Sequence, residues 1–194
     1  MRGLIAMYGA GLALALAGGG ASAQEAKTFD VVGSVPQICT VQEPTISAAG
    51  PLLNFRGLNG TTLQVDQLVD SQTMTTRAAS VDVSFEATCN LPHRIVLESQ
   101  NNGLWRNVTS PPPSGFADGV PYTATLTWGL INSRFEVDAS SRRTSEQSVL
   151  VDEATAGEIL IRLAIQPGAS NLRANAPLIA GTYQDTLRVT VEPQ

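Results

Sequence analysis

The sequence predicts an all-β domain folded as a two-sheet β-sandwich. From Thr28 onward, β-branched residues alternate with polar ones, and Gly, Pro, Asn or Asp interrupts the runs about every ten residues, as between short strands. No stretch sustains the apolar period of an amphipathic helix. No internal repeat at a fixed period suggests a propeller or solenoid. A closed barrel of similar size is the structural alternative to the sandwich.

The N-terminus predicts export. Arg2 precedes an apolar run over residues 4–17, and small residues follow up to Ala21, Ser22 and Ala23, which is the pattern of a cleavable secretory signal. The run is shorter than the roughly 20 residues that a membrane-spanning helix needs. We therefore assign residues 1–23 to a signal peptide and expect the exported chain to begin at Gln24, with enough length for one domain.

Two cysteines, Cys39 and Cys89, follow the signal peptide. An even number of cysteines in an exported protein predicts a disulfide. Closing a loop of about 50 residues would stabilise the fold by roughly 4 kcal/mol in the chain-entropy model. The alternative is a pair of free buried thiols.

The middle of the domain holds the clearest strand patterns. Residues 80–89 place Val81, Val83, Phe85, Ala87 and Cys89 on one face, which we expect to face the core, with Asp82 and Glu86 outward. Residues 93–99 place Ile95 and Leu97 together. The turn residues 101–103, Asn-Asn-Gly, are typical of a hairpin to Leu104 and Trp105.

Next comes a loop and a third core strand. Three prolines within residues 107–119 indicate a surface loop. Residues 122–128 resume the alternation, with Tyr122, Ala124, Leu126 and Trp128 on the core side. Residues 132–147 are the most polar part of the domain, and residues 138–143 predict an exposed, mobile connection.

Two strong strand patterns close the chain, over residues 158–165 and residues 181–191. In the second, alternate residues from Tyr183 to Val191 share one face. The apolar members of that face fix the register of the strand against the core.

The sequence shows no catalytic or metal-binding pattern. Its single histidine, His93, follows Pro92 at a strand start and is expected to be solvated, without the further ligands that a metal site needs. No nucleophile motif occurs, and Asp82 and Glu86 point outward from their strand. The chain carries 12 basic and 17 acidic residues without a basic cluster, which disfavours nucleic-acid binding. We expect no enzymatic activity and no cofactor.

Two stretches resemble the spore coat protein U domain family, which includes subunits of archaic chaperone–usher pili. Residues 28–41 resemble the N-terminal strand that runs into the first cysteine of that family, Cys39 here. Residues 180–191 resemble its closing strand; the motif residues are Gly181, Tyr183, Asp185, Leu187, Val189 and Val191. Residues 87–90 and 122–129 agree more loosely.

The resemblance implies an incomplete, pilin-like, immunoglobulin-like sandwich over residues 37–194, completed by a strand that a neighbouring subunit donates. It implies a periplasmic chaperone and an outer-membrane usher as partners. Residues 24–36 fit the donor segment, because Phe29, Val31, Gly33 and Val35 share one face. The alternative for this segment is an ordinary first strand within its own domain.

The hypothesis is therefore a secreted structural subunit of a cell-surface pilus or fibre, assembled by donor-strand exchange and contributing to adhesion or biofilm formation. Its partners are other copies or related subunits. The alternative hypothesis is a self-contained secreted β-sandwich that binds a sugar or surface polymer through Trp105, Phe116 and Tyr122.

Overall fold

The computed structural model of the chain describes residues 27–108 and 110–194. Within them every regular element is a strand, and all strands belong to the compact unit Pro36–Gln194. The fold is all-β, which confirms the sequence prediction. The predicted signal peptide, residues 1–23, lies outside the described residues. Among the described residues, none belongs to a helix that is long and apolar enough to cross a membrane.

The strands vary from short bridging pieces to β6 and β13, which have 11 residues each. In chain order they are β1 (Cys39–Val41), β2 (Thr45–Ile46), β3 (Leu52–Leu53), β4 (Phe55–Asn59), β5 (Thr62–Val65), β6 (Ala79–Cys89), β7 (His93–Ser99), β8 (Leu104–Arg106), β9 (Gly119–Val120), β10 (Tyr122–Trp128), β11 (Ile131–Val137), β12 (Ser145–Val151), β13 (Thr155–Ile165), β14 (Tyr183–Gln184) and β15 (Leu187–Pro193).

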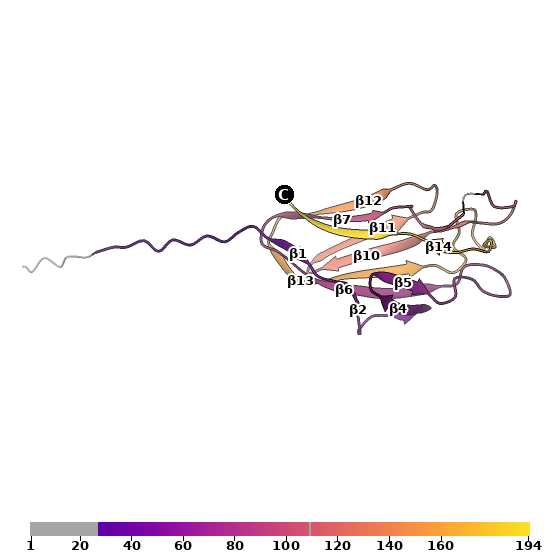
Figure 1. Ribbon diagram of the computed structural model, residues 1–194, viewed down its shortest axis with the longest axis horizontal. Helices are drawn as coiled ribbons and strands as arrows, with labels where there is room; N and C mark the ends of the chain where they lie inside the picture. The colour runs from indigo at the N-terminus through magenta and orange to yellow at the C-terminus, as the bar shows by residue number, and fades with distance from the viewer. Residues whose placement is uncertain (1–26, 109) are drawn as a thin grey trace, which may run out of the picture. The chain divides into compact units, whose positions relative to one another are not determined.

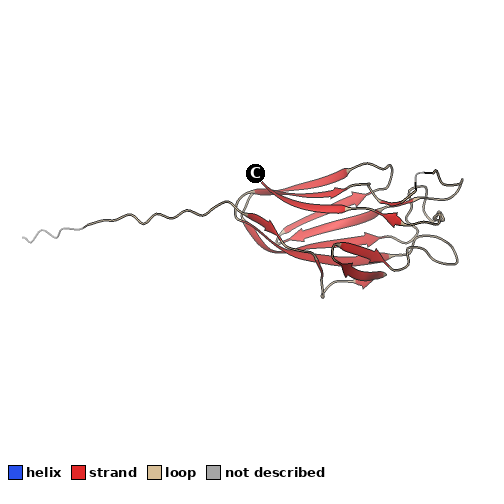
Figure 2. Cartoon of the chain, in the orientation of Figure 1, coloured by secondary structure: helices blue, strands red, loops and turns tan. Residues whose placement is uncertain are grey.

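Two antiparallel sheets carry most of the sandwich (Figure 1 and Figure 2). The larger has the strand order β1-β6-β13-β10-β11, and β2 and β3 also pair with β6. The second sheet has the order β12-β7-β15. Two smaller sheets are β14-β8-β9 and the hairpin β4-β5. In Figure 1, β12, β7 and the yellow strand β15 lie over the larger sheet, an arrangement consistent with a β-sandwich.

The core forms where the alternating pattern predicted it. On β6 the five residues of the predicted core face are all buried, and on β10 the four predicted core residues are buried as well. On β7, Ile95 and Leu97 are 1% and 2% exposed. Because successive side chains of a strand point to opposite faces, strict alternation predicts the buried face reliably.

The disulfide between Cys39 and Cys89 is present. It joins neighbouring strands, since Cys39 lies directly opposite Cys89 in the antiparallel pair of β1 and β6. The prediction of this bond is confirmed. A disulfide of this kind indicates maturation in an oxidising compartment, which is the periplasm or the extracellular space.

The expected pairing of residues 93–99 with Leu104 and Trp105 is wrong. Asn102 and Gly103 do adopt positive φ angles, 51° and 138°. However, β7 pairs with β12 and β15, whereas β8 pairs with β9 and β14. The turn therefore carries the chain from one sheet to another instead of closing a hairpin.

The polar stretch 132–147 contains strands that the sequence did not indicate. β11 and β12 occupy most of it, and only the connection between them is a loop. Both strands lie at sheet edges, and much of each faces solvent. β12 is exposed over most of its length and lacks the alternation that identifies a half-buried strand, whereas β11 does alternate, with Phe135 and Val137 buried.

Asp82 does not face solvent, contrary to the sequence prediction, because it is 1% exposed. Arg162, its cross-strand neighbour on β13, donates from Nε and Nη2 to the two carboxylate oxygens at 2.8 and 2.7 Å. Gly50 covers the carboxylate so closely that a Cβ at this position would lie 2.4 Å from Asp82. The segment between β2 and β3 thus buries the outer face of β6 at this point.

His93 is also buried and not solvated, with no exposed surface. Its Nδ1–H donates to the carbonyl of Leu91 at 2.9 Å, and its ring centroid lies 5.0 Å from that of Trp128. The imidazole is therefore part of the core, and the sequence prediction failed because the covering strands are distant along the chain.

Candidate functional site

β7 and β15 differ in how well their core-facing side chains are covered. The two apolar core residues of β7 are almost fully buried, whereas Leu187, Val189 and Val191 of β15 are only half-buried although they pack against the same core. A row of half-exposed apolar side chains along one strand marks a candidate interaction surface.

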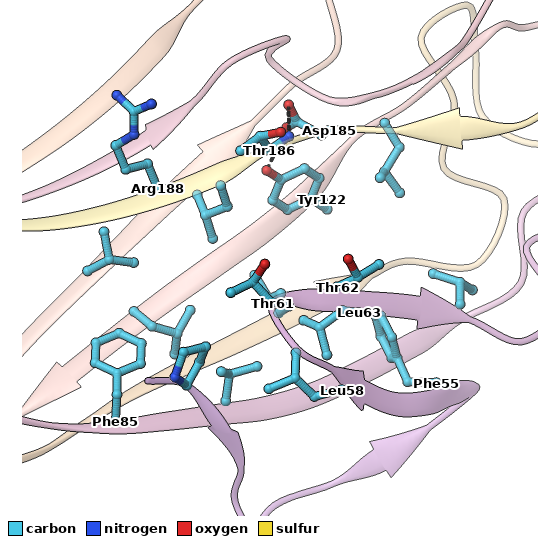
Figure 3. A pocket seen from close by; sticks show the side chains of 18 of the residues that line it. Phe55, Leu58, Thr61, Thr62, Leu63, Phe85, Tyr122, Asp185, Thr186 and Arg188 are labelled. Atoms are coloured by element: carbon cyan, nitrogen blue, oxygen red, sulfur yellow. Dashed lines mark hydrogen bonds between the residues drawn. The ribbon is translucent and has the colours of Figure 1, made fainter. Parts of the chain in front are cut away.

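Beside this row lies an apolar groove with a volume of about 590 Å³. β15 forms one wall through Leu187, Arg188 and Val189, and the hairpin β4-β5 forms the other. Figure 3 shows Phe55, Leu58 and Leu63 across the groove from Tyr122, Asp185 and Arg188. The remaining lining residues come from β1 and the segment after it, β5 and its turn, β6, β8, β13 and the step before β15: Val41, Gln42, Pro44, Thr61, Thr62, Val65, Val83, Phe85, Leu104, Ile161, Leu163, Ile165 and Thr186.

Both walls of the groove present open strand edges. Among the described strands, β15 pairs only with β7, and β5 pairs only with β4. In an antiparallel strand, alternate backbone N–H and C=O groups point to either side, so an edge strand keeps a row of unpaired groups. The groove therefore combines apolar side chains at its floor with backbone hydrogen-bonding groups at its rim.

Asp185 lies in the wall of the groove, beside Tyr122 and Thr186 (Figure 3). It lies in the irregular step between β14 and β15. Its Oδ2 accepts hydrogen bonds from Ser99 Oγ at 2.5 Å and from Tyr122 OH at 2.7 Å. Its Oδ1 accepts them from the backbone N–H groups of Asn101 and Thr186 at 3.0 and 2.8 Å. This cluster ties the end of β7 and the start of β10 to the start of β15.

The Tyr122 hydroxyl is strongly affected by this environment. Burial raises its pKa above the ordinary value of a tyrosine, and the carboxylate of Asp185 raises it further by disfavouring a second negative charge. Tyr122 therefore stays neutral and donates its proton to Asp185 over the physiological pH range.

The other residues of the closing-strand motif support the small sheet. Tyr183 OH donates to the carbonyl of Ile179 at 2.8 Å, and burial raises the pKa of Tyr183 to about 12. Gly181 lies so close to Arg106 that a Cβ would be 2.7 Å from its side chain. Tyr183 and Asp185 thus have structural partners, while Leu187 and Val189 line the groove and Val191 packs beside them.

The proposed donor residues lie in a segment without regular structure. Residues 27–38 form no strand. The apolar residues on the predicted donor face, Phe29, Val31 and Val35, expose 85%, 87% and 83% of their surface. Gly33 has no neighbouring heavy atom within 4 Å of the place where a Cβ would be. The donor role of this segment stays a prediction.

The start of the sandwich is firmly held at residues 36–38. Asn90 Nδ2 donates to the carbonyl of Pro36, and Asn90 Oδ1 accepts from the N–H of Ile38, both at 2.8 Å. The Cys39–Cys89 disulfide follows immediately. The chain therefore enters the sandwich at a fixed point beside the end of β6.

The aromatic residues of the alternative sugar-binding hypothesis do not form an exposed platform. Trp105 and Tyr122 are each only 9% exposed, and Phe116 is half-buried. The guanidinium of Arg142 covers the ring of Trp105 at 5.2 Å from its centroid. Within residues 27–108 and 110–194, no three His, Cys, Asp or Glu side chains gather as a metal-binding group.

The groove itself was not predicted from the sequence. Its second wall, the hairpin β4-β5, could have been recognised from the turn residues Asn59 and Gly60 between two short strands that contain apolar residues. The sequence does not show, however, which strand lacks a neighbour. Neither a protein-family model nor a curated protein matches the chain. The likeness to the spore coat protein U domain family therefore stays a prediction.

Proposed function

We propose that the chain is a secreted structural subunit of a cell-surface pilus or fibre, assembled by donor-strand exchange. In this proposal the domain is an incomplete immunoglobulin-like sandwich, and residues 28–35 of one copy fill the groove beside β15 of the next. The observation that carries the proposal is the half-buried apolar face of β15 along an unpaired strand edge. Donated strands satisfy both features, since their backbone pairs with the edge and alternate side chains enter the groove.

The segment is long enough to run along the edge of β15 and past its first residue. At about 3.3 Å per residue, the eight residues 28–35 extend over about 26 Å, and the seven residues of β15 extend over about 23 Å. The donor face brings large apolar side chains at Phe29, Val31 and Val35, which are exposed in the chain itself. Filling the groove would remove both apolar surfaces from water.

The geometry of the contact explains why a fibre would form. The donated segment and the groove are different surfaces of the same chain, so each copy can give one strand and receive one. A contact between unlike surfaces that does not close into a ring produces an open filament. A filament on the bacterial surface would serve adhesion or biofilm formation. A periplasmic chaperone would protect the groove before assembly, and an outer-membrane usher would export the growing fibre.

Deletion of residues 27–35 from the exported chain tests the proposal. The intact chain should form a ladder of oligomers on a denaturing gel that disappears on boiling, and the deleted chain should run only as a monomer. A ladder that persists after the deletion would show that the segment is not the donor. A stable monomer of the intact chain, without any chaperone, would instead favour a self-contained binding module.

A further inference from the structure

We propose that the incoming strand runs antiparallel to β15 with Asp30 of one copy directly opposite Arg188 of the next. This register rests on the proposed function and specifies its partner, a second copy of this chain. It follows from three separate observations on the described residues: the charges on the outer face of β15, the hydrogen-bond cluster of Asp185 in the groove wall, and the point where the chain enters the sandwich.

The outer face of β15 carries opposite charges near its two ends. Arg188 is exposed and points away from the apolar groove side chains in Figure 3. Its Nη1 lies 3.6 Å from Glu98 of β7, and its side chain keeps 59% of its surface exposed. Glu192, near the other end, pairs with Arg94 at 2.5 Å. A new neighbour of β15 therefore meets a cation at one end and an anion at the other.

Charge selects among the registers that keep the faces correct. With Phe29 and Val31 turned inward, Asp30 points outward, and shifts of two residues keep this arrangement. Asp30 can then stand opposite Arg188, Thr190 or Glu192. Opposite charges on directly facing residues attract, and like charges repel. Only the position opposite Arg188 gives an attractive pair.

The shape of the groove selects the same register. When Asp30 faces Arg188 in an antiparallel pair, Phe29 faces Val189, Val31 faces Leu187 and Gly33 faces Asp185. Residues 28–31 then lie along β15, and residues 32–35 continue past Asp185 to Tyr183 of β14. Leu187 and Val189 line the open part of the groove. Asp185, in the wall of the groove, already accepts hydrogen bonds from Ser99 and Tyr122. A residue without a side chain fits beside that cluster, and Gly33 is the only glycine of the segment.

The direction follows from where the chain enters the sandwich. Asn90 holds Pro36 and Ile38, and the N–H of Gln194 donates to the carbonyl of Pro92 at 3.1 Å, so the entry point and the end of β15 lie at the same end of the domain. A parallel strand would leave the groove there, where the acceptor's own segment begins. An antiparallel strand leaves beside Tyr183, at the opposite end, and allows the chain of subunits to continue.

Peptide binding to the full exported chain tests this register. The acceptor carries Val31→Asp, which disables its own segment without altering the sandwich. Two synthetic peptides of residues 27–36 are compared, one natural and one with Asp30→Arg. We expect the altered peptide to bind about fivefold more weakly to this acceptor, and the preference to reverse with Arg188→Glu. Since both charges are exposed, high salt should reduce the preference.

Two further acceptors separate the possible outcomes. Arg188→Gln should abolish the preference between the peptides without reversing it. This neutral variant controls for the chance that the glutamate of Arg188→Glu disrupts the strand. Glu192→Arg should leave the preference unchanged. The register would be overturned, but donation left intact, if the Arg188 variants kept the same preference for the natural peptide as the unaltered acceptor. A preference that changed with Glu192→Arg instead would also overturn the register. Failure of both peptides to bind any acceptor would overturn the proposed function itself.

Discussion

β7 and β15 are neighbours in one sheet and face the same core, yet only β7 is covered. Its core residues are almost fully buried, while those of β15 are half-exposed along the groove. At the other edge of the sheet, β12 lies beside β11 of the larger sheet, so that flank of the sandwich is closed. β1 also approaches β15, but among the described strands it does not pair with it, and the apolar groove lies along Leu187 and Val189.

Loss of the disulfide, which anchors a strand that lines the groove, should cause the largest loss of stability. Replacing Cys39 and Cys89 by alanine removes the covalent link between β6 and β1, the strand that contributes Val41 to the groove. Removing a crosslink across about 50 residues should lower the free energy of unfolding by about 4 kcal/mol, measured by urea denaturation. An unchanged midpoint would mean that the bond does not constrain the unfolded chain.

Matched leucine-to-alanine substitutions on β7 and β15 should lower the stability by different amounts. Leu97→Ala on β7 removes a side chain that is 2% exposed and should cost about 3 kcal/mol. Leu187→Ala on β15 removes the same group from the groove wall and should cost only about 1 kcal/mol in the unassembled chain. The comparison uses urea denaturation of both variants in the Val31→Asp background. Equal losses would contradict an open groove.

The hydrogen bond between Tyr122 and Asp185 in the groove wall should make the stability depend on high pH. The pKa of Tyr122 is raised in the folded state, so the folded chain resists ionisation that the unfolded chain undergoes near pH 10. The stability is therefore fully present below pH 10 and falls above it, by up to about 1.4 kcal/mol per pH unit for this group.

Tyr122→Phe should make that fall smaller. A residual fall is expected up to about pH 12 from Tyr183, whose pKa is raised to about 12. The measurement is the free energy of unfolding of both chains at pH 8 and pH 11. If the free energy of unfolding fell equally in the two chains between pH 8 and pH 11, a group other than Tyr122 would cause the fall.

Local alternation predicted the central strands but not the cover around them. β6 and β10 could be recognised because one face of each is uniformly apolar. The burial of Asp82 depends on Arg162, which is 80 residues away in sequence, and on the close approach of Gly50. His93 is likewise flanked by segments that are distant in sequence, since Val151 and Pro193 lie opposite it on the neighbouring strands. The sequence shows what each residue prefers, but only the three-dimensional arrangement shows which distant segment satisfies that preference.

The groove is the clearest case of this limit. The sequence indicated the apolar face from Leu187 to Val191 and the alternating segment from Phe29 to Val35. It could not show that the first lacks cover, because an unpaired edge is a property of sheet order. The family resemblance suggested the connection between the two segments, and the structure supplies the open edge and the apolar groove that make the connection physically reasonable.

The most direct test of donation compares two adjacent valines. Val31 lies on the predicted donor face and Val32 on the opposite face, and they are 87% and 91% exposed in the chain itself. Val31→Asp would bury a carboxylate in an apolar groove, while Val32→Asp would leave it in solvent. Assembly of each exported chain into oligomers, followed on unboiled denaturing gels, should be abolished by Val31→Asp and retained with Val32→Asp. Equal assembly by both variants would contradict insertion of this segment into the groove.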